Sequence, residues 1–247
     1  MAHLNLSSFD KPIRAAVIGV SGGIGAQLAL QLCNHHAVST VYGFSRSSAT
    51  IEHDKLQEGS IDITDEHSIR EACQMITEPL NLIIIATGLL HADDLMPEKG
   101  VRDLDFEIMR KVFDVNALGP SLVIKHFSEH LPRDNKSLIV ALSARVGSIS
   151  DNQIGGWYAY RASKAALNMM LKTASIELAR KYKETTIVGL HPGTVDTHLS
   201  EPFQQGVAEH KLFSAEQSAG YLLDVINTLD ATDTGKVFDW AGEEIQP

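Results

Sequence analysis

The chain has 247 residues, of which 44% are hydrophobic and 21% are charged, and its formal net charge is −10 at pH 7. This composition is ordinary for a globular enzyme and allows one α/β domain or two small ones. The negative charge argues against a nucleic-acid or anionic-membrane partner.

The N-terminal stretch and the two cysteines indicate the compartment. No apolar core precedes Ile13, and no apolar run approaches the length of a membrane span, so we expect neither a signal peptide nor a membrane segment. Cys33 and Cys73 fall in predicted helices without metal-ligand spacing, which indicates free buried thiols in a reducing compartment. The sequence therefore predicts a cytoplasmic protein without a metal site.

The first predicted strand, residues 13–18, leads into a glycine-rich loop and then a helix over about residues 24–36. Glycines in such a turn allow close approach to a phosphate and close packing of helix on strand, and the helix N-terminus favours a pyrophosphate. The spacing is GxxxGxG rather than GxGxxG, and packing alone can also require such a turn. The residues expected to contact a dinucleotide here are Gly19, Ser21, Gly22, Gly23, Ile24 and Gly25.

The second predicted strand, residues 38–44, ends in Ser45, Arg46 and Ser47. In a dinucleotide fold this strand end faces the adenosine ribose, where an acidic residue would bind a 2′-hydroxyl. Arg46 instead suits a 2′-phosphate, because its guanidinium can donate two hydrogen bonds, and the serines could add more. NADP(H) is therefore favoured over NAD(H), although a solvated loop arginine is the alternative.

A short third strand near residues 60–61 leads to a helix ending near residue 76, for which Thr64 or Asp65 is a plausible N-cap. Asp62 either accepts a hydrogen bond from the adenine amino group or is only a capping residue. The apolar fourth strand, residues 82–86, suits a parallel strand covered on both faces. Dinucleotide contacts in these segments are expected from Asp62, Ile63, Ala86, Thr87 and Gly88.

A long helix is predicted over about residues 104–131, with apolar residues on more than one face. Pro120 lacks an N–H, so the helix should kink and leave the carbonyl of Asn116 free, together with its amide side chain. The alternative is a tolerated kink satisfied by water. The broadly apolar faces of this helix and of the next one indicate a homo-oligomer, a dimer or a tetramer.

The stretch with the clearest chemistry begins where the fifth strand, residues 138–142, runs into Ser143. Tyr160 and Lys164 follow at helical i, i+4 spacing and therefore share a face. An ammonium beside a phenol favours the phenolate and lowers a tyrosine pKa that is ordinarily near ~10. Ser143 could hold a substrate oxygen beside Tyr160. A YxxxK pair alone often only faces water, and Ser148 and Ser150 in the same loop are alternative serines.

The helix is expected to continue to about residue 183, and a sixth strand, residues 186–190, then ends in a Pro-Gly turn on the ligand side. Residues 198–213 suggest a mobile flap, and a last helix (214–229) and a strand near 236–239 complete the chain. Strands and helices alternate without repeats or linkers. We therefore predict a single domain over residues 1–247, with a Rossmann-like, doubly wound parallel sheet.

In this order, these residues resemble the short-chain dehydrogenase/reductase family over nearly the whole chain. The stretch SARVGSISDNQIGGWYAYRASKAALN is most similar to the branch that contains the C-factor signalling proteins and the sniffer-type carbonyl reductases. Two positions depart from the family pattern. Ile18 stands where the family has Thr, and Ala86-Thr87-Gly88 stands where it has Asn-Ala-Gly.

The resemblance implies a seven-stranded sheet and a tetrad. Tyr160 would be the proton donor and acceptor, and Ser143 would hold the substrate carbonyl. Lys164 would lower the pKa of Tyr160 and bind the nicotinamide ribose, and Asn116 would anchor a water in a proton relay to Lys164. The nicotinamide carboxamide would be held by the segment that contains Pro192, Gly193, Val195 and Thr197.

The leading functional hypothesis is an NADP(H)-dependent oxidoreductase that reduces a small carbonyl compound or oxidises the alcohol. The alternative is a dinucleotide-binding, C-factor-like signalling or regulatory protein with secondary catalytic activity. A structural oligomerisation module would leave Tyr160 and Lys164 unexplained.

Overall fold

The computed structural model describes residues 5–48, 51–205 and 212–247, and its centre is one sheet of seven parallel strands. The strand order is β3-β2-β1-β4-β5-β6-β9, and every neighbouring pair is parallel. This arrangement confirms the predicted doubly wound fold. The strands are β1 (Ile13–Ile18), β2 (Val38–Ser45), β3 (Leu56–Ser60), β4 (Leu82–Ile85), β5 (Ser137–Leu142), β6 (Thr185–His191) and β9 (Val237–Asp239).

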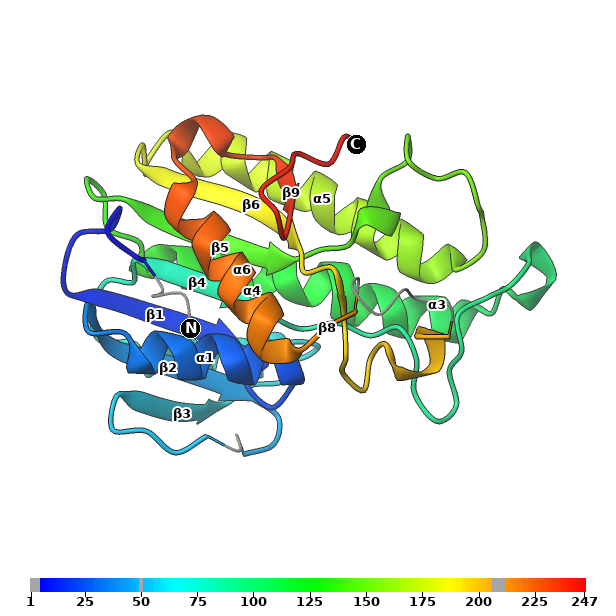
Figure 1. Ribbon diagram of the computed structural model, residues 1–247, viewed down its shortest axis with the longest axis horizontal. Coiled ribbons are helices and arrows are strands. Elements are labelled where there is room, and N and C mark those ends of the chain that lie inside the picture. The colour runs from blue at the N-terminus through cyan, green and yellow to red at the C-terminus, as the bar shows by residue number, and fades with distance from the viewer. Residues whose placement is uncertain (1–4, 49–50, 206–211) are drawn as a thin grey trace.

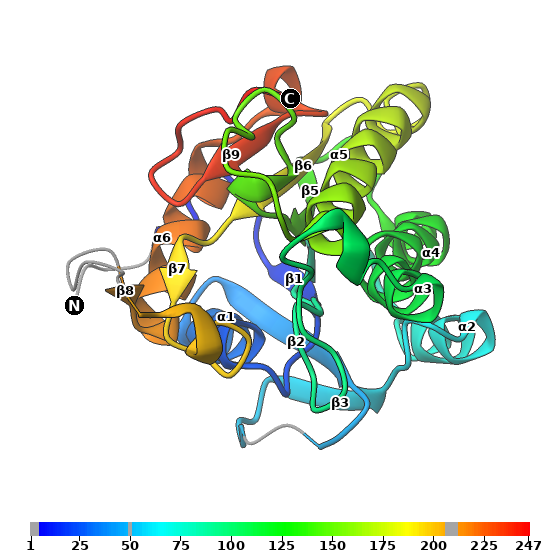
Figure 2. The same ribbon diagram turned by 90° about the vertical axis from the view of Figure 1, so that its right-hand side faces the viewer.

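Helices cover both faces of the sheet, as the end-on view of Figure 2 shows. One face carries α1 (Gly23–Asn34) and α6 (Ala215–Thr228), which also pack against each other. The other face carries α2 (Glu66–Gln74), α3 (Phe106–Phe113), α4 (Gly119–Phe127) and α5 (Tyr158–Leu178) (Figure 2). Figure 1 shows the sheet face-on, with α1 and α6 across it.

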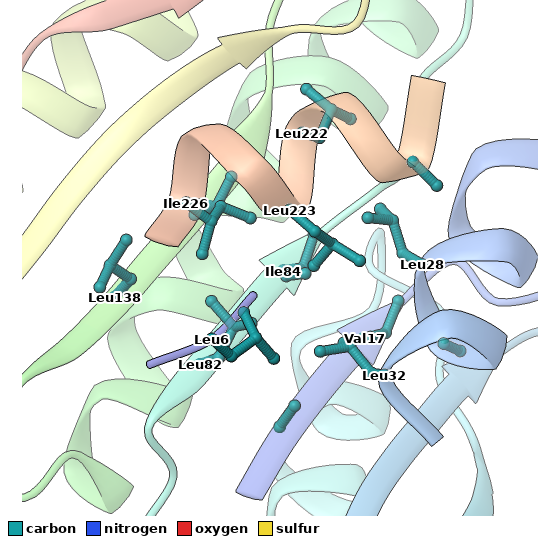
Figure 3. Packing of buried hydrophobic residues seen from close by; sticks show 14 of the residues in the cluster. Leu6, Val17, Leu28, Leu32, Leu82, Ile84, Leu138, Leu222, Leu223 and Ile226 are labelled. Atoms are coloured by element: carbon teal, nitrogen blue, oxygen red, sulfur yellow. The ribbon is translucent and has the colours of Figure 1, made fainter. Parts of the chain in front are cut away.

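Two apolar cores hold these layers together, one on each side of the sheet. In Figure 3, Leu223 of α6 lies beside Ile84 of β4 and Leu28 of α1, and Leu222 and Ile226 belong to the same cluster. Each fully buried side chain of this size stabilises the fold by about 1.5–3 kcal/mol relative to exposure to water. The sheet is therefore a rigid support for the loops at its carboxyl edge.

The predicted helix over 104–131 is divided in the structure. Asp105 caps α3 by accepting hydrogen bonds from two backbone N–H groups, and a π-helical turn, η2 (Asp114–Leu118), separates α3 from α4. Gly119 N donates to Asp114 O, five residues back, just before Pro120, which has no N–H to donate. The predicted kink is thus a widened turn, and π turns are frequent at functional sites.

Other boundaries also differ from expectation. β3 ends at Ser60, where we expected the strand only to begin, and α5 ends at Leu178 rather than near residue 183. The described part of the predicted flap forms the short helix η5 (Glu201–Phe203) and the strand β8 (Leu212–Phe213), which pairs with β7 (Thr194–Val195). Residues 206–211 of the predicted flap lie outside the described residues.

Both cysteines are buried and free, and burial raises the pKa of each thiol to about 11. Within the described ranges, no helix is long and apolar enough to cross a membrane. Nor does any group of three or more His, Cys, Asp or Glu side chains there have an arrangement that could hold a metal ion.

Candidate functional site

A cleft with about 660 Å³ of empty space lies at the carboxyl ends of β1, β2 and β4. Ten of the predicted cofactor residues line it: Gly19, Ser21, Gly22, Ser45, Arg46, Asp62, Ile63, Ala86, Thr87 and Gly88. The predicted residues outside this lining are Gly23, Ile24, Gly25, Ser47, Tyr160, Lys164, Pro192, Gly193, Val195 and Thr197. Four lining residues were not predicted as contacts: Ile18, Ile61, Thr64 and Val115. Three of these four are apolar, and a sequence does not distinguish such side chains from core residues.

The glycine loop is packed too closely for side chains. Gly19 has a φ of +100°, and a Cβ on it would lie 2.9 Å from Ala86 O. A Cβ on Gly25 would lie 2.1 Å from Gly19 O. The start of α1 therefore packs closely against the end of β1, as the phosphate-binding interpretation requires.

The N-terminus of α1 opens at this cleft. Its N-cap is Gly22, which lines the cleft, and no side chain caps the first turn. Uncapped N–H groups and the positive end of the helix dipole fit a phosphate. The Thr87 hydroxyl, also in the lining, is buried without a hydrogen-bond partner among the described residues. Together these groups fit a dinucleotide.

Arg46 lies at the far end of the cleft, and its side chain is exposed. It forms no ion pair with any residue in the described part of the chain, so its guanidinium has no competing acidic partner within 4 Å. The Ser45 hydroxyl, in contrast, donates to Ser47 O. This bond stabilises the turn, so Ser45 is less available to a ligand than we expected.

Asp62 forms a turn with Thr64 and also lines the cleft. Its Oδ1 accepts hydrogen bonds from Thr64 N (2.9 Å) and Thr64 Oγ1 (2.7 Å), and the Thr64 side chain is the main reason that the Asp62 pKa is lowered. Asp62 also lines the cleft. The N-cap of α2 itself is Asp65, which accepts from His67 N.

Asn116 is fully buried in the π turn, and its side chain binds the loop that follows β4. Oδ1 accepts from Leu89 N (2.7 Å), and Nδ2 donates to Leu89 O (2.8 Å) and Ser163 Oγ (3.1 Å). We expected the kink to present this side chain, together with a free Asn116 carbonyl, to a ligand. The structure instead uses it to fix the cofactor-side loop against α5.

Tyr160 and Lys164 lie on α5 at the edge of the cofactor cleft, and both are buried. Lys164 Nζ donates to Leu142 O (2.7 Å), at the end of β5, and lies 5.8 Å from the centroid of the Tyr160 ring. A Cβ on Gly88, a cleft residue, would lie 3.8 Å from both Lys164 Nζ and Asn116 Oδ1. The structure therefore brings Asn116, Tyr160 and Lys164 together beside the cleft.

Burial governs the protonation of both side chains. It raises the pKa of Tyr160 to about 12 and lowers the pKa of Lys164 to about 8. Each shift favours the uncharged form. The expectation that the Lys164 charge lowers the Tyr160 pKa is therefore not met in the protein alone, because removal of the phenol from water outweighs it.

Ser143 does not have the expected orientation. Its Oγ donates to Asn168 Oδ1 (2.6 Å), and Asn168 lies eight residues beyond Tyr160, about 12 Å along α5. The next residue, Ala144, is in extended conformation and packs in the apolar cluster that contains Tyr160. Successive side chains of an extended segment point to opposite sides. The site therefore presents a methyl group, not the predicted serine hydroxyl, to Tyr160.

The segment after β6 closes the site from the other side. Gly193 has a φ of +80°, and Pro192 O accepts from Ser218 Oγ of α6 (2.9 Å). A Cβ on Gly23 would lie 2.8 Å from the Thr197 methyl group. The predicted carboxamide-binding segment thus meets the glycine loop, although 174 positions separate Gly23 from Thr197.

The sequence did not indicate the apolar cluster around Tyr160 or the role of Glu98. The cluster consists of Leu90, Ala144, Val146, Trp157, Tyr160, Leu199 and Phe203. Glu98 is only 4% exposed, and its Oε2 accepts from Ala159 N (3.1 Å) in the first turn of α5. These residues come from separate loops, so no local pattern could group them.

A protein-family model described as short chain dehydrogenase matches residues 14–208. A 1-hydroxy-2-glutathionyl-2-methyl-3-butene dehydrogenase from Rhodococcus sp. is 31% identical over 182 residues, which are 72% of this chain and 75% of that protein. The C-signal of Myxococcus xanthus is 34% identical over 143 residues, covering 58% of this chain and 81% of that protein.

Solved structures share the fold. An NADPH-bound carbonyl reductase from chicken fatty liver aligns with a TM-score of 0.84 at 23% identity, over 98% of this chain and 97% of that one. The carbonyl reductase Sniffer of D. melanogaster aligns with a TM-score of 0.82 at 19% identity, over 96% of this chain and 100% of that one.

Proposed function

Since the chain belongs to the short-chain dehydrogenase/reductase family, we propose that it is an NADP(H)-dependent oxidoreductase that reduces a small carbonyl compound or oxidises the corresponding alcohol. One observation carries the proposal. A buried tyrosine and a buried lysine, one helical turn apart, adjoin a cleft whose glycine loop and uncapped helix fit a dinucleotide.

The chemistry follows from this arrangement. A bound nicotinamide would supply or accept the hydride. Tyr160, which burial keeps protonated at neutral pH, would donate a proton to the substrate oxygen or accept it back. Lys164, anchored on Leu142 O, would lie beside the phenol and bind the nicotinamide ribose.

The two remaining tetrad residues act less directly in this proposal. Asn116 holds the loop after β4 through Leu89, and its carbonyl would order a water that leads to Lys164. With the Ser143 hydroxyl bound to Asn168, we assign the substrate oxygen to Tyr160 alone, and Ser143 fixes the end of β5 against α5.

We propose NADPH as the preferred cofactor, because Arg46 lies exposed at the ribose end of the cleft and no acidic side chain among the described residues holds it in an ion pair within 4 Å. The Asp62 carboxylate acts on it at longer range. A phosphate bound through two guanidinium donors gives a charge-assisted contact that a 2′-hydroxyl does not give. The NADPH-bound chicken carbonyl reductase and the Sniffer reductase, which share the fold, support the cofactor class and the reaction class.

The test combines binding and turnover. NADPH and NADH are titrated separately against the wild type, Arg46→Ala and the control Arg102→Ala, with nicotinamide fluorescence as the signal. We expect tighter binding of NADPH, a loss of about tenfold or more in Arg46→Ala, and no loss in the control. Tyr160→Phe should bind NADPH normally and fail to turn over aldehydes; unchanged turnover would remove Tyr160 from the mechanism.

The second candidate function is a dinucleotide-binding signalling protein, which the similarity to the C-signal of M. xanthus favours. Its physiological effect would require cofactor binding but not Tyr160. The Tyr160→Phe variant therefore separates the two, since a signalling effect that persists in this variant supports the second function. We further propose that the protein acts in the cytoplasm as a homo-oligomer.

A further inference from the structure

We propose that Trp157 makes this site selective for carbonyl compounds that carry a flat, uncharged aromatic group beside the carbonyl carbon. This inference rests on the proposed reductase function and adds the substrate class.

The backbone that carries Trp157 has an unusual conformation. Gly155, Gly156 and Trp157 have φ values of +72°, +66° and +52°, so three consecutive residues are left-handed. Glycine adopts this region at little cost, but for a bulky residue it is a genuine outlier. Among the described non-glycine residues, Trp157 alone has a positive φ. Strain of this kind persists only where surrounding contacts impose it, and it concentrates at ligand sites.

Those contacts are present on both sides of the turn. Trp157 N donates to Glu98 O (2.6 Å), and Ala159 N donates to Glu98 Oε2 (3.1 Å). Arg161 Nε donates to Gly156 O (3.1 Å) from one turn further along α5. A buried carboxylate and an arginine thus fix the turn that carries Trp157 and, three residues later, Tyr160.

The indole packs beside Tyr160, the proposed proton donor. Its ring centroid is 6.2 Å from that of Tyr160 and 4.9 Å from that of Phe203, and both contacts are edge-on. Leu90, Ala144, Val146 and Leu199 complete the surroundings. An aromatic group attached to the substrate carbonyl would pack against the indole, either next to Phe203 or in its place.

No member of this cluster carries a charge. At its rim, the His91 ring lies 5.8 Å from Phe203, and His91 Nε2 is bonded to His198 O (2.8 Å). A charged substrate group here would lose its hydration, and the nearby Arg161 guanidinium is already engaged by Gly156 O (3.1 Å) and Val146 O (3.4 Å). A flat ring would instead gain the favourable aromatic geometry that the indole offers. The surroundings therefore select against charge and for aromatic character.

Three aldehydes test the inference with NADPH as reductant. Benzaldehyde carries the ring, cyclohexanecarboxaldehyde has the same carbon skeleton without planarity, and 4-carboxybenzaldehyde adds a charge. For the wild type we expect kcat/KM for benzaldehyde to exceed that for the saturated aldehyde about three- to tenfold. We expect it to exceed that for the charged aldehyde by about a hundredfold or more.

The variants assign the preference to Trp157. In Trp157→Ala the advantage of benzaldehyde over cyclohexanecarboxaldehyde should disappear, while Trp157→Phe should keep most of it. The control is Tyr158→Ala, which removes a neighbouring exposed aromatic residue outside the cluster and should leave the preference unchanged. Equal losses for both uncharged aldehydes in Trp157→Ala would overturn the inference and leave the reductase function standing.

A binding measurement separates the failure of the inference from failure of the proposed function. If the wild type reduces none of the three aldehydes, calorimetry with benzyl alcohol and cyclohexylmethanol on the protein with NADP⁺ decides the question. Tighter binding of benzyl alcohol, lost in Trp157→Ala, would support the aromatic site although the reductase function failed. Equal binding of the two alcohols would overturn the inference as well.

Discussion

Tyr160 and Lys164 are both removed from water, and this has a measurable consequence for each residue. Burial holds the phenol protonated far above neutral pH and lowers the pKa of Lys164 from 10.5 to about 8. A lysine with a lowered pKa binds fewer protons in the folded than in the unfolded chain between these two values. Its contribution to stability therefore increases as the pH rises through that window.

Lys164→Met tests this linkage. Between pH 7 and pH 9.5, the free energy of unfolding of the wild type should rise by about 2 kcal/mol relative to that of the variant. Urea denaturation of both proteins at the two pH values measures the double difference, in which the titration of all other groups cancels. A double difference near zero would mean that Lys164 titrates near its ordinary value.

Gly25→Ala tests the packing of the glycine loop. The added Cβ would meet Gly19 O at 2.1 Å, so we expect a loss of at least about 2 kcal/mol in stability and weakened NADPH binding. Gly100→Ala is the matched control, because its Cβ would meet nothing within 4 Å and should change stability by less than about 0.5 kcal/mol. Thermal unfolding and nicotinamide fluorescence report the two effects. Normal stability and binding in Gly25→Ala would show that the loop can shift.

At the scale of elements, the central strands and the edge strand β9 were predictable, but the opposite edge strand β3 was not. β4 and β5 are continuous buried runs, as expected for parallel strands that are covered on both faces. β3 (LQEGS) is mostly exposed at the edge of the sheet, so no apolar pattern marked it. Pro120 predicted an interruption in the long helix but not the π turn.

The site was predictable where one element carries the pattern. Tyr160 and Lys164 share one helix, and their proximity follows from helix geometry alone. The orientation of Ser143 depends on Asn168, a residue 25 positions away in the sequence, and the role of Glu98 depends on a contact with Ala159 across 61 positions. Only tertiary packing decides such contacts.

Glu98 acts on α5 as a cap supplied by another segment. Glu98→Ala should leave Ala159 N without its acceptor, lower stability by about 1–2 kcal/mol and reduce kcat, because the turn before Tyr160 loses a constraint. Glu98→Gln keeps an oxygen acceptor and should recover most of both losses. Urea denaturation and steady-state turnover measure these effects, with the exposed Lys99→Ala as control. Equal values for Glu98→Ala and the wild type would contradict the capping role.

At the scale of the whole molecule, the parallel sheet brings every functional segment to one edge. Residues from β1, β2, β4, β5 and β6 and from the start of α5 meet there, although they span most of the chain. The opposite, solvent-facing side of α5 carries Met169, which is 65% exposed, and Ile176, which is 57% exposed. These residues are seven positions apart and therefore share one face of the helix.

This exposed face of α5 leads us to expect self-association. The wild type should behave as a dimer or tetramer in light scattering, and the double variant Met169→Glu/Ile176→Glu should behave as a smaller species, because charges at a buried interface disfavour assembly. Ile154→Glu, which changes a 91% exposed residue outside α5, is the control. A monomeric wild type would contradict the expectation of a homo-oligomer.

The strand order has a consequence for synthesis on the ribosome. β1 emerges first, and every later strand of the sheet pairs with a strand that has already left the exit tunnel: β2 and β3 on one side, and β4, β5, β6 and β9 on the other. Because domains begin to fold from the N-terminal side during synthesis, the nascent sheet can grow outward from β1 without waiting for its C-terminal half. The outer edge of β6, which leads into His191 and Pro192, is covered last. It gains its partner β9 only when translation has passed Asp239, so the edge of the sheet that carries the proposed nicotinamide-binding segment is the last part of the sheet to be completed.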